Sequence, residues 1–188
     1  MLILNENLLI AKGGTRNCYH HPTRNDQCVK VTHNGSIRMY LRTLREIYYT
    51  KKYKTKKFEV APYYYGKTKT NLGTGYIFGK VKDWNGKTST TLLNFVKYND
   101  EDKILAMISQ LYNSFLKNRA LVHDLHPGNI VVYYKDLKTD PYLVLIDGIG
   151  NNDFIKICDY SKFFHKKKLN RKFDRLMQKL NIQDQRFK

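Results

Sequence analysis

Apolar residues in the first third of the chain form two short runs and one helical pattern. Residues 8–11 and 28–31 are short runs of the β type flanked by polar turns, so we predict two strands that pair antiparallel. From 36 to 54 apolar residues recur at intervals of three and four, which predicts a helix with Ser36 as its N-cap. This stripe consists of Ile37, Tyr40, Leu41, Leu44, Ile47 and Tyr48.

A second group of strands is expected before the middle of the chain. Residues 60–66 and 75–81 have strand patterns, and a turn through 70–74 joins them. The pair Asn85-Gly86 then interrupts the pattern, because Asn-Gly favours a turn. We place a hinge there, which divides the chain into an N-terminal lobe of residues 1–82 and a C-terminal lobe of residues 83–188.

The second half is predicted to be mainly helical. Thr90 or Thr91 is suited to cap a short helix that ends near Val96. Two apolar runs, 130–134 and 142–146, predict a short hairpin. A longer helix precedes this hairpin, and its apolar stripe consists of Ile104, Leu105, Ile108, Leu111, Tyr112, Phe115 and Leu116.

The last segment of the chain is basic. Residues 162–188 contain ten Lys or Arg and two Asp. Its apolar residues recur roughly at helical spacing, which predicts a basic amphipathic helix. These apolar residues are Phe163, Phe164, Leu169, Phe173, Leu176 and Leu180.

The hexad 124–129, D-L-H-P-G-N, lies between a predicted helix and a predicted strand and carries the strongest chemical signal. A kinase-type catalytic loop needs a carboxylate that accepts the proton of the attacking hydroxyl, and an amide five residues later that holds a metal ion. Asp124 and Asn129 have this spacing. Asp147, which follows the run 142–146, is then expected to bind the magnesium ions at the nucleotide phosphates. The alternative for Asp147-Gly148 is a plain hairpin turn.

Two charged residues upstream complete the order of features that a kinase-like fold has. Lys30, on a predicted strand, is suited to anchor the α- and β-phosphates, and Glu46, on the predicted helix, to hold that ammonium group by an ion pair. Each also has a simpler interpretation. Lys30 alone reads as an ordinary lysine at a strand edge, and Glu46 as a solvated partner of Arg42 one turn away.

A glycine-containing turn precedes both charged residues. Gly13, Gly14 and Thr15 would let backbone amides approach phosphate, although the turn lacks the pattern G-x-G-x-x-G. The order of all these features predicts a small, truncated, two-lobed α+β fold of the protein-kinase type. We expect an antiparallel sheet with one helix in the first lobe, and a mainly helical second lobe with a short catalytic hairpin.

The composition limits the kinds of partner and the cellular compartment that we expect for this protein. The 188 residues include 34 Lys or Arg against 16 Asp or Glu, a formal net charge of +18, which attracts phosphate groups of nucleotides, nucleic acids or membrane surfaces. An AT-rich genome is an equally good source of this lysine excess. The three cysteines lack close pairing, the N-terminus lacks a signal pattern, and no stretch has the length of a membrane span. We therefore expect a cytoplasmic protein, with its oligomeric state left open.

Several segments resemble the PhoP regulatory network protein YrbL family, a bacterial group similar to the protein-kinase and aminoglycoside-phosphotransferase superfamily. The hexad is common to that wider superfamily, which includes aminoglycoside and choline kinases, whereas the resemblance to the YrbL family covers nearly the whole chain. Its segments are 14–22 (GTRNCYHHP), 28–31 (CVKV), 44–46 (LRE), 73–76 (GTGY), 83–86 (DWNG) and 147–150 (DGIG).

The resemblance implies ATP and Mg²⁺ as cofactors and a role for each site residue. Asp124 would be the catalytic carboxylate, Asn129 and Asp147 the magnesium ligands, Lys30 the phosphate anchor and Glu46 its partner. No A-P-E segment is present and the tail after Asp147 is short, which argues against a conventional protein kinase.

Three functional hypotheses remain. The first is a Mg-ATP-dependent phosphotransferase that acts on a hydroxyl of a small molecule or a cell-envelope saccharide, with an anionic molecule or glycolipid as acceptor and with the basic C-terminal helix resting on anionic lipid. The second is a kinase-like regulatory protein, a pseudokinase, that binds nucleotide without phosphoryl transfer. Nucleic-acid binding through the basic stretches 38–57 and 162–188 ranks third, because no nucleic-acid motif accompanies the charge.

Overall fold

The computed structural model describes residues 1–32, 37–54 and 60–182. Ser36, the expected helix cap, and residues 183–188 of the expected C-terminal helix lie outside the described residues. The described chain is a mixed α+β structure with two antiparallel sheets and five α-helices, so the α+β prediction is confirmed. Within the described ranges, no helix combines the length and the apolar character that a membrane crossing needs.

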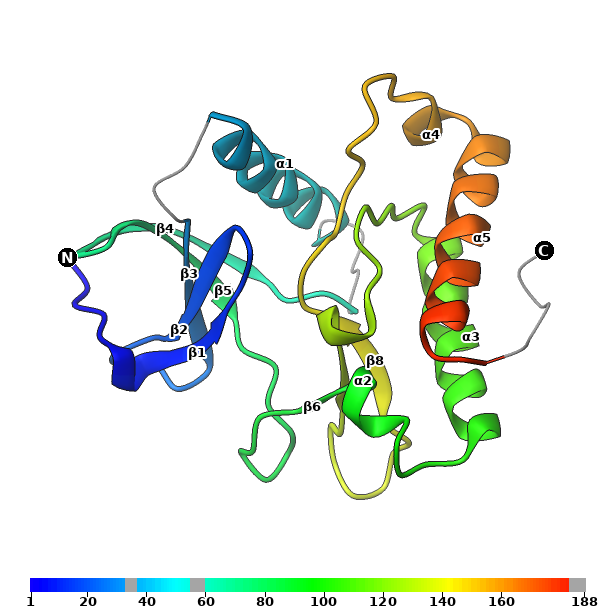
Figure 1. Ribbon diagram of the computed structural model, residues 1–188, viewed down its shortest axis with the longest axis horizontal. Helices are drawn as coiled ribbons and strands as arrows, with labels where there is room; N and C mark the ends of the chain where they lie inside the picture. The colour runs from blue at the N-terminus through cyan, green and yellow to red at the C-terminus, as the bar shows by residue number, and fades with distance from the viewer. Residues whose placement is uncertain (33–36, 55–59, 183–188) are drawn as a thin grey trace.

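The first half forms a five-stranded antiparallel sheet in the order β1-β2-β3-β5-β4. A 3₁₀ turn, η1 (Glu6–Leu8), precedes it. In Figure 1 this sheet lies at the N-terminal end of the molecule, with helix α1 across one side. The strands are β1 (Leu9–Lys12), β2 (Arg16–His20), β3 (Gln27–Thr32), β4 (Tyr64–Thr70) and β5 (Gly73–Gly79).

The predicted direct pairing of residues 8–11 with 28–31 is wrong. Strand β2 lies between them: β1 pairs with β2, and β2 pairs with β3. The sequence of β2, R-N-C-Y-H, has no apolar run, which is why the apolar pattern missed the strand. Arg16 at its start faces a site between the two halves of the molecule, whereas Tyr19 packs with Leu4, Val29 and Val31 in the first half.

Helix α1 (Ile37–Lys54) forms where the apolar stripe predicts it, but most of that stripe faces solvent. Of the stripe, Ile37, Tyr40, Leu41, Leu44 and Tyr48 are exposed. The opposite side of the helix is buried. Glu46 on this side faces the sheet, and Tyr49 and Tyr53 pack in the core of the second half. The buried residues of α1 are Thr43, Glu46, Ile47, Tyr49, Thr50 and Tyr53.

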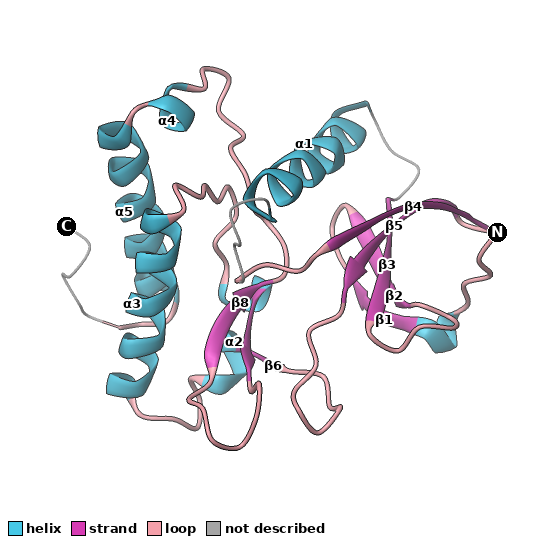
Figure 2. Ribbon diagram, turned by 180° about the vertical axis from the view of Figure 1, so that it is seen from behind, coloured by secondary structure: helices cyan, strands magenta, loops and turns pink. Residues whose placement is uncertain are grey.

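The second half combines a small sheet with helices (Figure 2). Strands β6 (Thr90–Thr91), β7 (Ile130–Tyr133) and β8 (Tyr142–Leu145) form a three-stranded antiparallel sheet. Thr91 Oγ1 accepts a hydrogen bond from Asn94 N, which makes Thr91 the cap of the short helix. The helices are α2 (Leu92–Phe95), α3 (Glu101–Lys117), α4 (Ile157–Tyr160) and α5 (Lys162–Lys179), with a 3₁₀ turn η2 (Pro127–Asn129) before β7.

The largest core lies where α3 and α5 pack beside β7 and β8. The ring of Phe173 on α5 meets those of Tyr112 and Phe115 on α3 edge to face, at centroid distances of 5.1 and 6.2 Å. The apolar side of α5 is therefore buried in the protein. Phe163 and Phe164, at the start of the helix, remain exposed.

The loop after β5 ties the two halves together at the expected break. Gly86 N donates to Asp83 O, and Gly86 has a φ of +78°, which favours glycine in this turn. The Asp83 carboxylate accepts hydrogen bonds from Ser89 Oγ and from Tyr134 N at the end of β7. The turn is therefore fixed against the second sheet.

We expect Phe173→Ala to lower the free energy of unfolding by about 3–5 kcal/mol, because it empties a fully buried position between α3 and α5. Phe163→Ala on the same helix should change it by less than about 1 kcal/mol, because that ring is 69% exposed. Urea unfolding followed by circular dichroism measures both. Equal losses in the two variants would contradict this description of the core.

Candidate functional site

The hexad 124–129 forms a compact loop between the end of α3 and β7. Gly128 N donates to His126 Nδ1, and Asn129 N donates to His126 O, so His126 shapes the turn. The Asn129 side-chain amide donates to Asp124 Oδ2 at 3.1 Å. The two predicted site residues of the loop are therefore in direct contact, and Asn129 keeps its Oδ1 as an acceptor.

The segment after β8 runs back against this loop. Ile146 N donates to Asn129 O, and His123 N donates to Gly148 O, each at 2.8 Å. Gly148 has a φ of +86°, and a Cβ there would lie 2.3 Å from Asp124 O. Asp147-Gly148 is thus a close backbone crossing beside Asp124, and the hairpin-turn alternative is wrong.

Lys30, Glu46 and Asp147 meet in the interior, although they come from β3, α1 and the end of β8. The Lys30 ammonium lies 3.6 Å from Glu46 Oε1 and 3.9 Å from Asp147 Oδ2, and it donates to Ile146 O at 2.8 Å. Its side chain is 10% exposed, so it is not a solvated strand-edge lysine. Glu46 is 6% exposed, which also excludes the solvated pair with Arg42.

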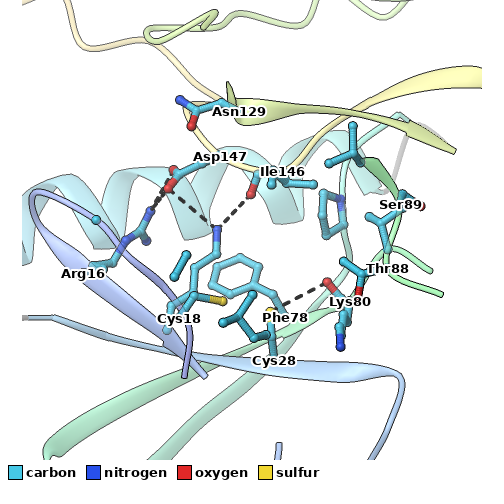
Figure 3. A pocket seen from close by; sticks show the side chains of 18 of the residues that line it. Arg16, Cys18, Cys28, Phe78, Lys80, Thr88, Ser89, Asn129, Ile146 and Asp147 are labelled. Carbon is cyan, nitrogen blue, oxygen red and sulfur yellow. Dashed lines mark hydrogen bonds and ion pairs between the residues drawn. The ribbon is translucent and has the colours of Figure 1, made fainter. Parts of the chain in front are cut away.

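A fourth residue, Arg16, completes the cluster, and sequence reasoning missed it. Its Nη2 lies 2.5 Å from Glu46 Oε2 and donates to both carboxylate oxygens of Asp147, at 2.8 and 3.0 Å. Figure 3 shows Arg16 reaching Asp147, and Lys30 approaches the same carboxylate from the neighbouring strand. Its position in the sequence could have revealed it, because Arg16 directly follows the glycine turn and is the first residue of β2.

One N–H group of Arg16 lacks a hydrogen-bond acceptor in the described part of the chain. Its side chain is 9% exposed, and its Nη1 has no partner among the residues that the structure describes. A buried guanidinium N–H without an acceptor is costly. An anion beside Arg16, such as a phosphate, would satisfy it.

The charges of the cluster support one another. Burial alone would raise the pKa of Asp147, but the nearby Lys30 and Arg16 charges hold it well below its usual value. Burial likewise acts to lower the pKa of Lys30, and the Asp147 and Glu46 carboxylates raise it above its usual value. Asp147 and Lys30 are therefore both charged at neutral pH.

The glycine turn closes over the cluster. Gly13 N donates to Arg16 O at 2.9 Å, and a Cβ at Gly13 would lie 2.7 Å from that oxygen, so the turn is too tight for a side chain. Gly14 and Thr15 lie at its tip. Gly13 lines two cavities that Asp147 also lines, so the backbone of the turn lies close to Asp147.

Two cavities meet at this cluster. The first, of about 320 Å³, lies under the sheet and is largely apolar, with Ala11, Phe78 and Val131 among its lining residues. The second, of about 280 Å³, is polar and holds Arg42, His123 and Asp124. The residues that line both cavities are Gly13, Arg16, Asn129 and Asp147.

Two oxygen donors of the kind that magnesium needs lie at the wall between the cavities, and Arg16 holds both oxygens of one of them, Asp147. Mg²⁺ prefers oxygen ligands, usually one or two from the protein together with water and phosphate oxygens. The Asp147 carboxylate and Asn129 Oδ1 have this chemistry. Within the described residues, no group of three or more His, Cys, Asp or Glu forms a metal site, so no cluster of these residues competes with this position.

A profile of the family described as the PhoP regulatory network protein YrbL matches residues 2–181. This chain belongs to that family. It is 27% identical over 170 residues to the protein named uncharacterized protein YrbL of Escherichia coli K12, and equally to that of Shigella flexneri. Each alignment covers 87% of this chain and 80% of the relative. The resemblance to the YrbL family is therefore confirmed.

The charge cluster predicts a specific acid response. Because Asp147 has a lowered pKa in the folded protein, its stabilising contribution is present above the unfolded value of about 3.9 and is lost as the pH falls below it. We expect the unfolding free energy of the wild type to fall more steeply between about pH 5 and pH 2 than that of Asp147→Asn. Urea unfolding at several pH values measures this.

The matched control is Asp140→Asn, which removes an exposed carboxylate from the turn between β7 and β8. It should keep the pH dependence of the wild type. Parallel curves for the wild type and Asp147→Asn would show that Asp147 is not held by Lys30 and Arg16.

Proposed function

We propose that this protein is a Mg-ATP-dependent phosphotransferase with a small two-lobed fold of the protein-kinase type, which transfers phosphate to a hydroxyl of a small molecule or cell-envelope saccharide. The observation that carries the proposal is the meeting of two cavities at Arg16, Asn129 and Asp147, with Lys30 on one side and Asp124 on the other. One cavity would take the nucleotide and the other the acceptor.

The first cavity suits a nucleoside base with its phosphates directed toward the cluster. Its apolar walls come from the sheet above and from β7 and the end of β8 below. The buried Lys30 ammonium lies at its inner end, together with the unpartnered Nη1 of Arg16. Two fixed cations at this place would bind the negative phosphate oxygens and stabilise the charge that moves during transfer.

Asn129 and Asp147 would hold the magnesium ion, which neutralises phosphate charge when it is bound. Glu46 has a supporting role, because its ion pairs hold Arg16 and Lys30 in place. Asp124 is exposed to the second cavity, and the Asn129 amide fixes one of its oxygens. It would orient the acceptor hydroxyl and accept its proton.

Cations surround the acceptor side as well. Arg42 lines the second cavity, and the Lys172 ammonium on α5 donates to His123 O next to Asp124. An acceptor that already carries a negative group is therefore favoured over a neutral one. This agrees with the formal net charge of +18.

One observation favours a second candidate, a kinase-like protein that binds nucleotide without transferring phosphate. Arg16 occupies both oxygens of Asp147, the proposed metal ligand, and so supplies there the positive charge that a metal would bring. A nucleotide bound beside Arg16 would then need no magnesium. The two candidates differ in the dependence of binding on magnesium.

We expect the wild type to bind ATP and a non-hydrolysable analogue in calorimetry, more tightly with magnesium than without. Asp147→Ala should lose the gain from magnesium, and Lys30→Met should weaken binding at least about tenfold, because it removes a buried phosphate ligand. Lys138→Met, on the exposed turn between β7 and β8, is the control and should bind as the wild type does. Binding that is equal with and without magnesium would favour the second candidate.

Asp124→Asn should keep nucleotide binding and lower ATP turnover by about 10²–10⁴-fold, because it removes only the group that accepts the proton. The measurement is formation of ADP with anionic saccharides as acceptors. Asp136→Asn, in the turn between β7 and β8, should keep full turnover. Unchanged turnover in Asp124→Asn would remove this residue from the mechanism.

A further inference from the structure

The segment between the site and α5 has its polar side chains inside and its apolar side chains outside. We define residues 154–167 as the apolar-basic ridge. Along it, Phe154 is 101% exposed, Ile155 72%, Tyr160 81% and Phe163 69%. Soluble proteins expose single apolar residues routinely, but a run of large ones within one short segment marks an interaction surface.

A buried polar network holds the ridge in this orientation. Asp159 accepts hydrogen bonds from Tyr49 Oη on α1 and from Asn151 Nδ2, both at 2.7 Å. Lys168 on α5 donates to Asn151 Oδ1 at 2.6 Å and pairs with Asp153 at 2.7 Å. The outward apolar side chains are therefore presented by a fixed backbone.

The same network leaves the ridge with positive charge only. The carboxylates on or next to it, Asp153 and Asp159, are both paired with lysines, Asp153 with the buried Lys168 and Asp159 with Lys52. The exposed charges are those of Lys162, Lys166 and Lys167 at the start of α5. The ridge thus combines protruding aromatic rings with unneutralised ammonium groups.

We infer that the apolar-basic ridge binds the surface of an anionic lipid bilayer. Protruding Phe, Ile and Tyr side chains enter the boundary between headgroups and acyl chains, while flanking lysines contact lipid phosphates. A bilayer suits this surface better than an acidic protein does, because exposed rings beside lysines match its apolar and anionic layers. The inference does not rest on the proposed phosphotransferase activity.

The ridge replaces the C-terminal helix as the expected membrane contact. The apolar residues of α5 beyond its first turns, Leu169, Phe173 and Leu176, are buried in the core and are not available to lipid. In Figure 1 the chain after β8 rises past α1 to α4, which lies at the edge of the molecule beside the start of α5. The contact therefore lies at an edge of the fold, on the segment that directly follows Asp147.

Helix α1 extends the apolar surface beside the ridge. Tyr49 and Lys52 of α1 both contact Asp159, so the helix and the ridge adjoin. The neighbouring side of α1 is the exposed stripe that includes Leu41, Leu44 and Tyr48. A bilayer, which is broad and nearly flat at this scale, would cover both.

The test is co-sedimentation of the full chain with vesicles at moderate salt. We expect binding to vesicles of phosphatidylcholine with phosphatidylglycerol and none to pure phosphatidylcholine. Phe154→Ser/Phe163→Ser should weaken binding by about tenfold or more, because two rings no longer enter the bilayer. The control Leu137→Ser removes an equally exposed side chain, 78%, from the turn between β7 and β8 and should bind as the wild type does.

Three results would overturn the inference. Equal binding of the double variant and the wild type would mean that net charge alone attracts the protein. Absence of wild-type binding to the anionic vesicles would exclude lipid and leave an acidic protein as the partner. A dimer in solution that Phe154→Ser/Phe163→Ser dissociates, without vesicle binding, would mean that a second copy covers the ridge.

A spectroscopic readout separates insertion from adsorption. The chain has one tryptophan, Trp84, so Phe154→Trp in a Trp84→Phe background places a single reporter on the ridge. Its emission should shift to the blue on anionic vesicles, as expected of a ring at the membrane interface. Binding without a shift would contradict the insertion of the ridge. Because all of these substituted residues are exposed, circular dichroism should match the wild type.

Discussion

The ion cluster of Arg16, Lys30, Glu46 and Asp147 is the interaction on which the arrangement of the two halves depends. Arg16, Lys30 and Glu46 belong to the first half, whereas Asp147 belongs to the second. Two buried cations and two carboxylates have no net charge, but each is costly to bury alone, so the halves must meet in one way for all four to be paired. The cluster thus fixes their relation together with the packing of Tyr49 and Tyr53 of α1 in the core of the second half.

Around this cluster, close approaches of the backbone, and not charges, position the remaining groups. Gly148 allows the chain to pass so close to Asp124 that a side chain there would collide with its carbonyl group. Gly150, with a φ of +111°, allows a similar approach to Tyr49 on α1. The path from Asp147 to the ridge is therefore set by two glycines and then by the buried Asp159 network. This segment therefore connects the proposed nucleotide site directly to the proposed lipid surface.

The sequence predicted elements better than it predicted contacts. The long helices formed where apolar spacing of three and four indicated them, because that spacing reflects the geometry of a single helix. Strand β2 was missed because its sequence has no apolar run, and Arg16 at its start is paired with Glu46 and Asp147 far away in the chain. For the same reason Arg16 was absent from the predicted site, although its position after the glycine turn was visible.

The sequence by itself determined the family, and it determined most of the elements because helix and strand patterns depend on residues close together in the chain. Asp124 and Asn129, five residues apart in the hexad, are in contact. Only the tertiary structure decided which charges share a cluster, because Arg16 and Asp147 are 131 residues apart. It also decided that the α1 stripe faces solvent and that the apolar side of α5 does not. An apolar stripe shows which side of a helix can be buried, and the neighbours that the fold supplies settle whether it is.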